Sequence, residues 1–402
     1  MAKRSADQKL VRMTNQNLIL STLRASESAT RSSLSKALQL SVPSVCANVD
    51  QLIEFGIVRE VGEETSSVGR KAKLLKMNFG FGYLVSIDLS NPCVTIALSD
   101  LEPKVVHEVK FDLELFELEQ LSELLLVNVE QLLTLAGVQP GRLLSISVSV
   151  PGIVDSERGV AECGSYLTPL GRVDFRALFM SKYDVPVLVQ KDIDAAVIAE
   201  RNFGAGKETD NAVFVSADVG VGLGILLGGA LFKGSRHAAG ELCKFVMDRE
   251  STEDGERLVD LVSAKALVQA VQREIRSGAA SQAVTEAGGS IDAIDFNAVI
   301  RATLAGDELC VRIVQECARI MGIAVSNILL LLDLECVILG GGFVSLGETY
   351  TATLAAEARK HVPNAPRIVT TKLKNKAVLM GGLSLALEST FEEVLERQEK
   401  AQ

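Results

Sequence analysis

The sequence predicts an α/β protein in which a small basic helix-turn-helix module precedes a body of two lobes. Its 402 residues exceed what one compact core accommodates, so two or three domains are expected. Residues 1–78 carry 12 Lys and Arg against 7 Asp and Glu, a net charge of +5, whereas the remainder carries −15. Beyond residue 79, β-type apolar runs alternate with helical segments in two series. We therefore expect a module at 1–78 and lobes at 79–200 and 201–402.

The composition is that of a globular protein. Hydrophobic residues make up 48% of the chain and charged residues 23%, which is close to the average for soluble domains. No apolar run approaches the roughly 20 residues that cross a bilayer. The first residues, M-A-K-R-S-A-D-Q-K, lack the apolar segment of a secretory signal. These features predict a cytoplasmic protein.

Cysteine and histidine form no recognisable metal or disulfide pattern. The seven cysteines are scattered singly, without a C-x-x-C pair, and their odd number argues against a disulfide framework. The three histidines lie far apart, with none of the spacings that zinc sites use. We expect free or buried thiols, no metal and no cofactor.

The first 78 residues show a winged helix-turn-helix pattern. Apolar residues at helical spacing in N-Q-N-L-I-L-S-T-L-R (15–24) predict a short first helix. Thr30 and Ser41 are expected to cap two further helices joined by a tight turn. Two β-type runs then flank a polar loop and predict a hairpin.

Such a module binds DNA with its third helix in the major groove and its wing against phosphates or the minor groove. The candidate contacts are Ser41, Ser44 and Asn48 on the helix, with Arg70 and Lys71 on the wing. The local positive charge favours this interpretation. The alternative is a small protein-interaction module built from the same elements.

Several runs of this N-terminal half, at 15–24, 53–62, 66–71 and 82–89, resemble the ROK family of transcriptional repressors and sugar kinases. The resemblance implies a winged helix-turn-helix joined to a two-lobed, actin-like (ribonuclease H-like) ATPase-type body. It also implies that the C-terminal helix returns to the first lobe. The wing of the family usually reads G-R-P, and Lys71 here replaces the proline with a positive charge.

Four stretches carry the same resemblance through the body. They are S-V-P-G-I-V-D (149–155), Q-K-D-I-D-A-A (190–196), G-S-R-H-A-A-G-E-L-C-K (234–244) and L-G-G-G-F (339–343). By resemblance, the first lies beside the sugar and includes Gly152, and the second includes Asp192, the position of the base in the kinases. The third contains Glu241 and His237 and corresponds to the sugar and zinc segment. The fourth corresponds to the glycine turn near the nucleotide.

The phosphate-binding loops of the kinases are altered. Their D-x-G-G-T-K loop is replaced by D-L-S-N-P-C-V (88–94), which has lost both glycines and the lysine, and Pro92 has no amide donor. Their G-T-G-x-G loop is replaced by a run that begins with Asp218, a carboxylate that repels polyphosphate in the absence of a metal. We expect ATP binding and kinase activity to be lost.

The sugar site is partly retained. Asp192 and Glu241 fall on sugar-contacting positions, but Lys191 replaces an asparagine, and Lys244 replaces the histidine that binds zinc in the family. The C-x-C-G-x-x-G-C zinc loop is replaced by an acidic segment at 248–256, so no zinc is expected. Two interpretations of the lysines remain. They form salt bridges that fill the site, or they bind an anionic effector such as a sugar phosphate or a sugar acid.

The resemblance, with the altered phosphate loops, implies a sugar-responsive or formerly sugar-responsive transcriptional regulator, most simply a repressor of carbohydrate genes, that lacks kinase activity. Two-fold recognition of a palindromic operator predicts a homodimer or a higher homo-oligomer. One alternative is a sugar kinase with an accessory DNA-binding domain. The other is a constitutive DNA-binding or interaction protein with a vestigial pocket.

Overall fold

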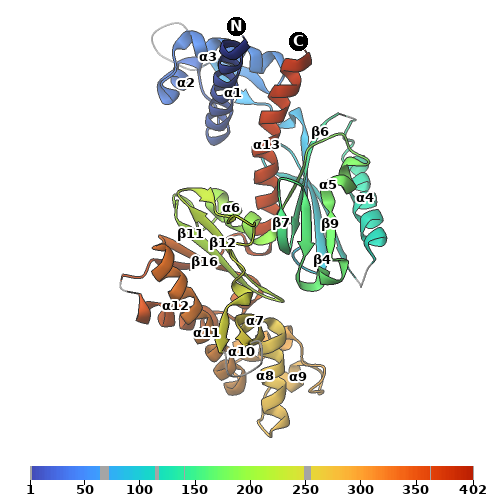
Figure 1. Ribbon diagram of the computed structural model, residues 1–402, viewed down its shortest axis with the longest axis vertical. Coiled ribbons are helices and arrows are strands. Elements are labelled where there is room, and N and C mark those ends of the chain that lie inside the picture. Colours follow the sequence, from blue (N-terminus) through green and yellow to red (C-terminus); the bar gives the residue numbers. More distant parts are fainter. Residues whose placement is uncertain are drawn as a thin grey trace.

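The computed structural model describes residues 2–63, 72–113, 117–139, 141–248, 255–362 and 364–401. The N-terminal module occupies one end of the molecule beside the C-terminal end of α13, and the two lobes of the body follow below it (Figure 1). The mixed α/β class expected from the sequence is confirmed.

The N-terminal module is a three-helix unit followed by a β-hairpin. Its elements are α1 (Ala2–Ala25), α2 (Arg31–Leu38), α3 (Val42–Glu54), β1 (Val58–Glu63) and β2 (Lys73–Met77). As expected, Thr30 caps α2 and Ser41 caps α3, each through a side-chain oxygen that accepts a backbone N–H. Between the helices, Gln39 adopts the left-handed conformation (φ 54°) that turns the chain.

The first helix is longer than the sequence pattern indicated. The amphipathic pattern predicted a short helix starting near residue 15, whereas α1 begins at Ala2. Residues 2–14 contain no glycine or proline and are rich in good helix formers such as Ala, Lys, Arg, Gln and Leu. The intrinsic helix propensity of residues 2–14 therefore extends α1 through a segment that has no amphipathic pattern.

The first lobe is built on a five-stranded sheet in the order β10-β6-β3-β4-β5. Strands β3, β6 and β10 are parallel, and β4 and β5 are antiparallel additions at the edge. A small antiparallel sheet, β7-β8-β9, lies beside it. The elements of this lobe are β3 (Tyr83–Asp88), β4 (Cys93–Ser99), β5 (Val105–Asp112), α4 (Leu118–Leu135), β6 (Leu143–Val150), β7 (Gly152–Asp155), β8 (Val160–Cys163), β9 (Arg172–Asp174), α5 (Phe175–Met180) and β10 (Val187–Lys191).

The second lobe repeats this strand order in the sheet β13-β12-β11-β16-β17. Here β11, β16 and β17 are parallel, and β12 and β13 are antiparallel. Its strands are β11 (Ala212–Ala217), β12 (Val221–Leu227), β13 (Ala230–Leu231), β16 (Cys336–Gly340) and β17 (Arg367–Thr370), with a separate hairpin of β14 (Val246–Asp248) and β15 (Glu256–Arg257). The repeated topology accounts for the two β/α series that the sequence shows.

Helices cover the second sheet and form the largest apolar core of the protein. They are α7 (Leu258–Val262), α8 (Ala264–Arg276), α9 (Ala283–Glu286), α10 (Phe296–Leu304), α11 (Glu308–Leu332) and α12 (Glu348–His361). Among the described helices, α11 alone is long and apolar enough to cross a membrane, by length and composition only. Because 61% of its most apolar window is buried in the protein, we describe it as a core helix.

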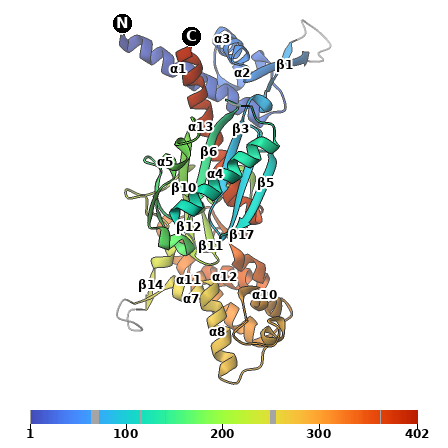
Figure 2. The ribbon, with the colours of Figure 1, turned by 90° about the vertical axis from the view of Figure 1, so that its right-hand side faces the viewer.

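Two helices connect the parts of the molecule. The first, α6 (Asp192–Phe203), spans the boundary expected at residue 200 and packs on β11 and β12 of the second lobe. The second, α13 (Ala377–Ala401), packs along α6 and across β3 and β6 of the first lobe. The last turns of α13 lie beside α1 (Figures 1 and 2).

The far end of α13 lies in the core of the N-terminal module. Leu383, Leu387 and Phe391 belong to the same buried apolar cluster as Ile19 and Leu23 of α1. The module is therefore packed onto the body through α13, in addition to being joined to it by the chain.

Candidate functional site

A cleft of about 1180 Å³ lies between the two lobes. Its walls come from the ends of β3, β6 and β10, from the turn between β11 and β12, from the glycine turn after β16, and from the start of α13. The chemically functional lining residues include Ser90, Asn91, Tyr166, Lys191, Asp192, Ser216, Asp218, Glu241, Cys243, Thr371 and Lys374. This position, at the carboxyl ends of parallel strands, is where α/β proteins bind small ligands.

Asp192 stands at the junction of β10 and α6. The strand ends at Lys191, and Asp192 is the first residue of the helix, where its carboxylate accepts the Ile193 N–H at 2.7 Å. A negative charge is favoured at a helix N-terminus. Burial nevertheless raises the pKa of Asp192 to about 7, and neither that hydrogen bond nor the charge of Lys191 offsets it. Near neutral pH the carboxyl group is thus able to donate or to accept a hydrogen bond.

Lys191 and Glu241 form a nearly buried ion pair in the cleft wall. The Lys191 Nζ lies 2.5 Å from Glu241 Oε1, and the two side chains are 9% and 19% exposed. Lys244 lies on the outer side of the same carboxylate, 3.4 Å from Glu241 Oε2, with 56% of its side chain exposed. Lys191, Asp192 and Glu241 thus line the cleft as a group, whereas Lys244 reaches only the outside of that group.

Gly152 also lines the cleft, where the chain requires a glycine. Its φ of +124° lies in a region that other residues rarely adopt, and an added Cβ would overlap the carbonyl oxygen of Glu162. His237 does not line the cleft, and its buried Nδ1 has no hydrogen-bond partner in the described part of the chain.

Asp194 adds a further buried carboxylate behind the cleft wall. It is 8% exposed, and burial raises its pKa to about 6, against the opposing charges of Lys191 and Lys233. In the family segment N-D-A-N this position is an asparagine, so the run K-D-I-D carries two charges where the family has two amides. The motif comparison that marks Lys191 as a departure from the family marks Asp194 as well.

The turn after β3 closes one end of the cleft. Asp88 at the end of β3 accepts the Ser90 N–H at 2.9 Å, and burial raises the pKa of this carboxyl. The hydroxyl of Tyr166 lies 2.8 Å from the carbonyl oxygens of both Leu89 and Asn91 and donates to this pair. The turn is therefore held by side chains of the protein and presents no row of glycine amides to a phosphate.

Asp218 lies in the turn between β11 and β12 and contacts the glycine turn after β16, on the opposite side of the cleft. Its Oδ2 accepts the Gly342 N–H at 3.0 Å, and burial raises the pKa of the carboxyl against this hydrogen bond. Gly341, with φ +77°, brings this turn against the backbone of Ala217. The backbone amide of Gly342 is thus already bonded to a side chain of the protein.

The described residues contain no group of three or more His, Cys, Asp or Glu side chains able to hold a metal ion. Residues 249–254, which form most of the acidic segment in the place of the zinc loop, lie outside the described ranges.

The candidate DNA contacts on α3 differ in exposure. Ser41 is exposed and Ser44 partly so, although the Ser41 hydroxyl already accepts the Ser44 N–H as the helix cap. Asn48 is only 6% exposed, and its side chain donates to the Ser44 carbonyl at 2.8 Å. It therefore faces the core, since its spacing from Val45 and Leu52 puts it on the apolar face of the helix. That spacing was visible in the sequence and argues against a role in reading bases.

The outer face of α3 is formed by other residues. Val42 is 52% exposed, and Pro43, Ala47 and Asp50 are also exposed. Arg31 of α2 donates to Asp50 at 2.6 Å and to Glu60 of β1 at 3.0 Å, which ties the helices to the hairpin. Arg70 and Lys71, the candidate wing contacts, lie outside the described residues.

Comparison with known proteins identifies relatives that match most of the chain. The chain is 27% identical over 387 residues to the xylose repressor of Caldicellulosiruptor bescii, a match that covers 94% of this chain and 96% of the relative. It is 24% identical over 319 residues to the DNA-binding transcriptional dual regulator NagC of Escherichia coli, covering 77% of this chain and 76% of that protein.

The fold is shared with both regulators and kinases of known structure. A ROK family transcriptional regulator, a homologue of the E. coli MLC protein, superposes with a TM-score of 0.82 at 24% identity over 96% of this chain and 98% of that one. A ROK family glucokinase from Streptomyces griseus, in complex with glucose and AMPPNP, superposes with a TM-score of 0.67 at 21% identity over 76% of this chain and 99% of the kinase. Residues 84–389 match the sequence model of the ROK family. This protein therefore belongs to the ROK family.

Proposed function

We propose that this protein is a sugar-responsive, DNA-binding transcriptional repressor that has no kinase activity and binds its operator as a dimer. The path of α13 is the observation that carries the proposal. Its first residues, Ala377 and Val378, line the cleft, and Leu387 and Phe391 lie in the core of the N-terminal module. A ligand that moves the cleft wall therefore acts on the same helix that supports the DNA-binding module.

DNA binding is supported by the relatives and by the module itself. The C. bescii relative is named a repressor and the E. coli relative a DNA-binding regulator. In the module, the exposed N-terminal end of α3, with Ser41 and Val42, is the part that would meet base edges. Arg70 and Lys71 of the wing would contact phosphates, and two modules about 34 Å apart would read a palindromic operator.

The absence of kinase activity is supported by the two phosphate loops. Asp218 bonds the glycine turn that would hold a phosphate, and the turn at Ser90 and Asn91 is held by Tyr166 and Asp88. A polyphosphate would have to displace the Asp218 carboxyl group from this turn, and its negative charges would be repelled by the carboxylate. Phosphoryl transfer also requires groups that neutralise and align the phosphates of ATP. Asp192 can supply only the base of such a reaction.

The effector that best fits the cleft is of the sugar type. Asp192 and Glu241 provide the carboxylate acceptors that bind sugar hydroxyls. A neutral sugar would leave the Lys191–Glu241 ion pair closed. A sugar phosphate or sugar acid would draw Lys191 or Lys244 away from Glu241 toward its own charge.

A thermal-shift screen combined with operator binding tests the proposal. The panel contains neutral pentoses and hexoses, sugar phosphates, sugar acids and ATP with magnesium. We expect at least one sugar-type ligand to raise the melting temperature and to change operator affinity, with no shift from ATP, because a ligand that binds only the folded state stabilises it by mass action.

Two outcomes would replace the proposal. A shift with ATP, together with sugar-dependent ATP consumption that Asp192→Asn abolishes, would identify a kinase with an accessory DNA-binding domain. Operator affinity that is indifferent to every sugar would identify a constitutive DNA-binding protein with a vestigial pocket.

A further inference from the structure

Tyr166 brings an aromatic ring to the first-lobe wall of the cleft. It belongs to the short helix η2 (Ser165–Leu170), shortly after β8, and it lines the cleft together with Asn91 and Asp192. The side chain is partly buried and packs against the apolar core of the first lobe. Any ligand that occupies this half of the cleft therefore lies close to the ring.

The segment that carries Tyr166 is fixed to the first lobe at two places. The Gly164 N–H donates to the Pro151 carbonyl, in the turn after β6, at 2.8 Å. The Tyr166 hydroxyl lies 2.8 Å from the carbonyl oxygens of Leu89 and Asn91, in the turn after β3. Because the ring is held between these two turns, it has little freedom to move aside for a ligand.

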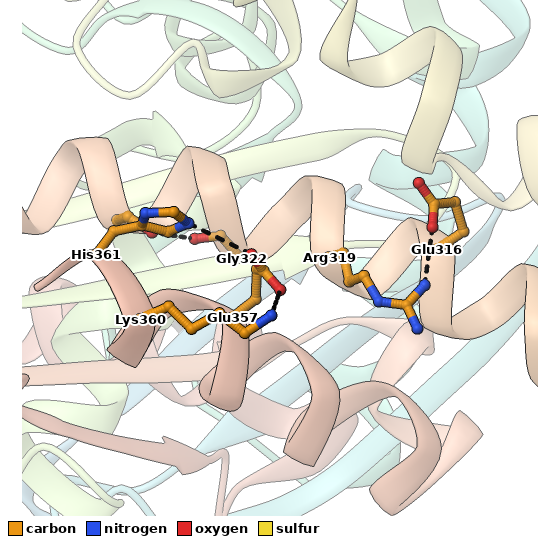
Figure 3. A network of polar contacts seen from close by, with 7 residues as sticks. Glu316, Arg319, Gly322, Glu357, Lys360 and His361 are labelled. Atoms are coloured by element: carbon orange, nitrogen blue, oxygen red, sulfur yellow. Dashed lines mark hydrogen bonds and ion pairs between the residues drawn. The ribbon is translucent and has the colours of Figure 1, made fainter.

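The bonds of Tyr166 differ from those of the polar clusters outside the cleft. Figure 3 shows Glu316 paired with Arg319 on α11, and Glu357 paired with Lys360 and His361 on α12. Those bonds join residues three or four positions apart on one helix, and none of those residues lines the cleft. The bonds of the Tyr166 hydroxyl join residues 77 and 75 positions apart, at the cleft wall itself. They therefore fix the ring relative to the cleft.

The Tyr166 hydroxyl also lies close to two carboxyl groups at this end of the cleft. Burial raises the pKa of Tyr166, and the charges of Asp88 and Asp192 raise it further. The phenol thus remains protonated through the neutral range and keeps its hydrogen bonds to the two carbonyls. The ring contacts the turn after β3 and is at the same time a neighbour of Asp192.

In a kinase, the space between these groups has to be open. A general base must reach the hydroxyl from which it removes the proton, and that hydroxyl must face the phosphate in the phosphate loop. The reacting hydroxyl therefore lies between the base and the loop, whose positions here are Asp192 and the turn 88–94. Tyr166 is bonded to that turn and lies near Asp192, so its ring takes up room that the reacting hydroxyl would need.

We propose that Tyr166 determines the size of the sugar that the cleft accepts. The ring leaves room beside Asp192 for a hydroxyl on the sugar ring itself and excludes one on an additional exocyclic carbon, so the cleft accepts aldopentoses in preference to aldohexoses. A difference of one carbon group in a fitted pocket changes affinity by roughly 10-fold to 200-fold. The inference rests on the proposed sugar response and narrows its ligand class.

Matched sugar pairs test the proposal by calorimetric titration of the full-length protein. Each pair contains an aldopentose and the aldohexose that has the same pyranose ring with one added hydroxymethyl group: D-xylose and D-glucose, L-arabinose and D-galactose, D-lyxose and D-mannose. For the pair that binds, we expect the wild-type protein to favour the pentose by about tenfold or more. Tyr166→Ala should bring the ratio of the two dissociation constants close to one, because it opens the space next to Asp192.

Three further variants separate the volume of the ring from other effects. Tyr166→Leu, a smaller truncation that keeps the side chain apolar, should lower the preference in the same direction. Tyr166→Phe keeps the ring and removes the hydroxyl, so it should retain most of the preference while both sugars bind more weakly. Tyr183→Ala is the matched control and should leave the ratio unchanged, since Tyr183 is also partly buried in the first lobe but does not line the cleft.

The outcomes distinguish this inference from the proposed function. A wild-type protein that favours the hexose, or a preference that Tyr166→Ala and Tyr166→Leu leave unchanged, would overturn the role of Tyr166 and leave the sugar response intact. Binding of none of the six sugars to the wild-type protein would also overturn it. The proposed sugar response would fail only if the sugar phosphates and sugar acids of the thermal-shift panel were without effect as well.

Discussion

Gly381 of α13 lies directly against Ala195 of α6, so that an added Cβ at Gly381 would overlap the Ala195 carbonyl oxygen. At the next residue, Gly382, a Cβ would be obstructed by the hydroxyl groups of Ser86 and Ser147. Because these two residues lack a Cβ, α13 can pack closely against α6 and against the sheet of the first lobe. These close contacts leave α13 and α6 little freedom to shift independently, which is what the proposed coupling between the cleft and the N-terminal module requires.

Replacing Gly381 tests this contact. Gly381→Ala should lower the free energy of unfolding by about 1–3 kcal/mol, because the obstructing atoms belong to backbone that cannot rotate away. It should also change the difference in operator affinity between ligand-bound and free protein. Gly80→Ala is the control, since its nearest contact would be an ordinary 3.8 Å from Asn78 Oδ1. Equal unfolding curves for Gly381→Ala and Gly80→Ala would contradict the close packing described here.

The end of α13 should matter for DNA binding beyond its contribution to stability. Leu387 and Leu125 are both fully buried leucines, the first in the cluster shared with the N-terminal module and the second in the core of the first lobe. Truncation of either to alanine should cost about 2–5 kcal/mol of unfolding free energy. Only Leu387→Ala should also weaken operator binding, measured at a temperature where both variants are folded. A matching loss of affinity in Leu125→Ala would show that α13 has no specific role.

Removing the exposed lysine of the Lys191–Glu241–Lys244 cluster should cost far less stability than removing the carboxylate that both lysines share. Lys244→Ala removes a pair whose lysine is 56% exposed and should cost less than about 1 kcal/mol. Glu241→Gln leaves the 9% exposed Lys191 without its carboxylate and should cost about 3 kcal/mol, as expected for a buried charge that has lost its partner. Urea unfolding of the two variants measures the difference. Similar small losses for both would mean that Lys191 reaches solvent when its partner is removed.

Stability should fall as pH rises through the acidic range because of the carboxyls at the start of α6. Burial raises the pKa of Asp192 to about 7 and that of Asp194 to about 6, above the value near 3.9 of an unfolded chain. The folded protein therefore binds these protons more tightly, and their contribution is fully present below about pH 4 and lost as pH rises toward 7.

The variant Asp192→Asn isolates one of these groups. Relative to wild type it should gain about 1–3 kcal/mol between pH 5 and pH 8, because the charged form that burial disfavours is absent. Asp292→Asn, at a side chain that is 86% exposed, controls for the loss of one surface charge. The melting temperatures of all three proteins, measured at steps across this range, provide the comparison. A stability difference between Asp192→Asn and wild type that does not vary with pH would contradict the assigned cause.

Features that depend on neighbouring residues were predictable from the sequence. The caps at Thr30 and Ser41 are bonds between residues three positions apart. The inward position of Asn48 was predictable in the same way, because the spacing of Val45 and Leu52 defines the buried face of α3. The place of Asn48 near the helix start favours a DNA contact, whereas its place on the buried face opposes one.

The contacts that make the cleft a site were decided by the tertiary structure. The sequence alone determined the class of fold, the winged module, and the residue types available at Asp192, Lys191 and Glu241. Only packing brings Lys191 to Glu241, 50 residues away, and the Asp218 carboxylate to Gly342, 124 residues away. Whether Lys191 pairs with an acid of its own chain or stays free for a ligand depends on how the end of β10 packs against the segment that carries Glu241. The local spacing of residues in the sequence carries no information on that packing.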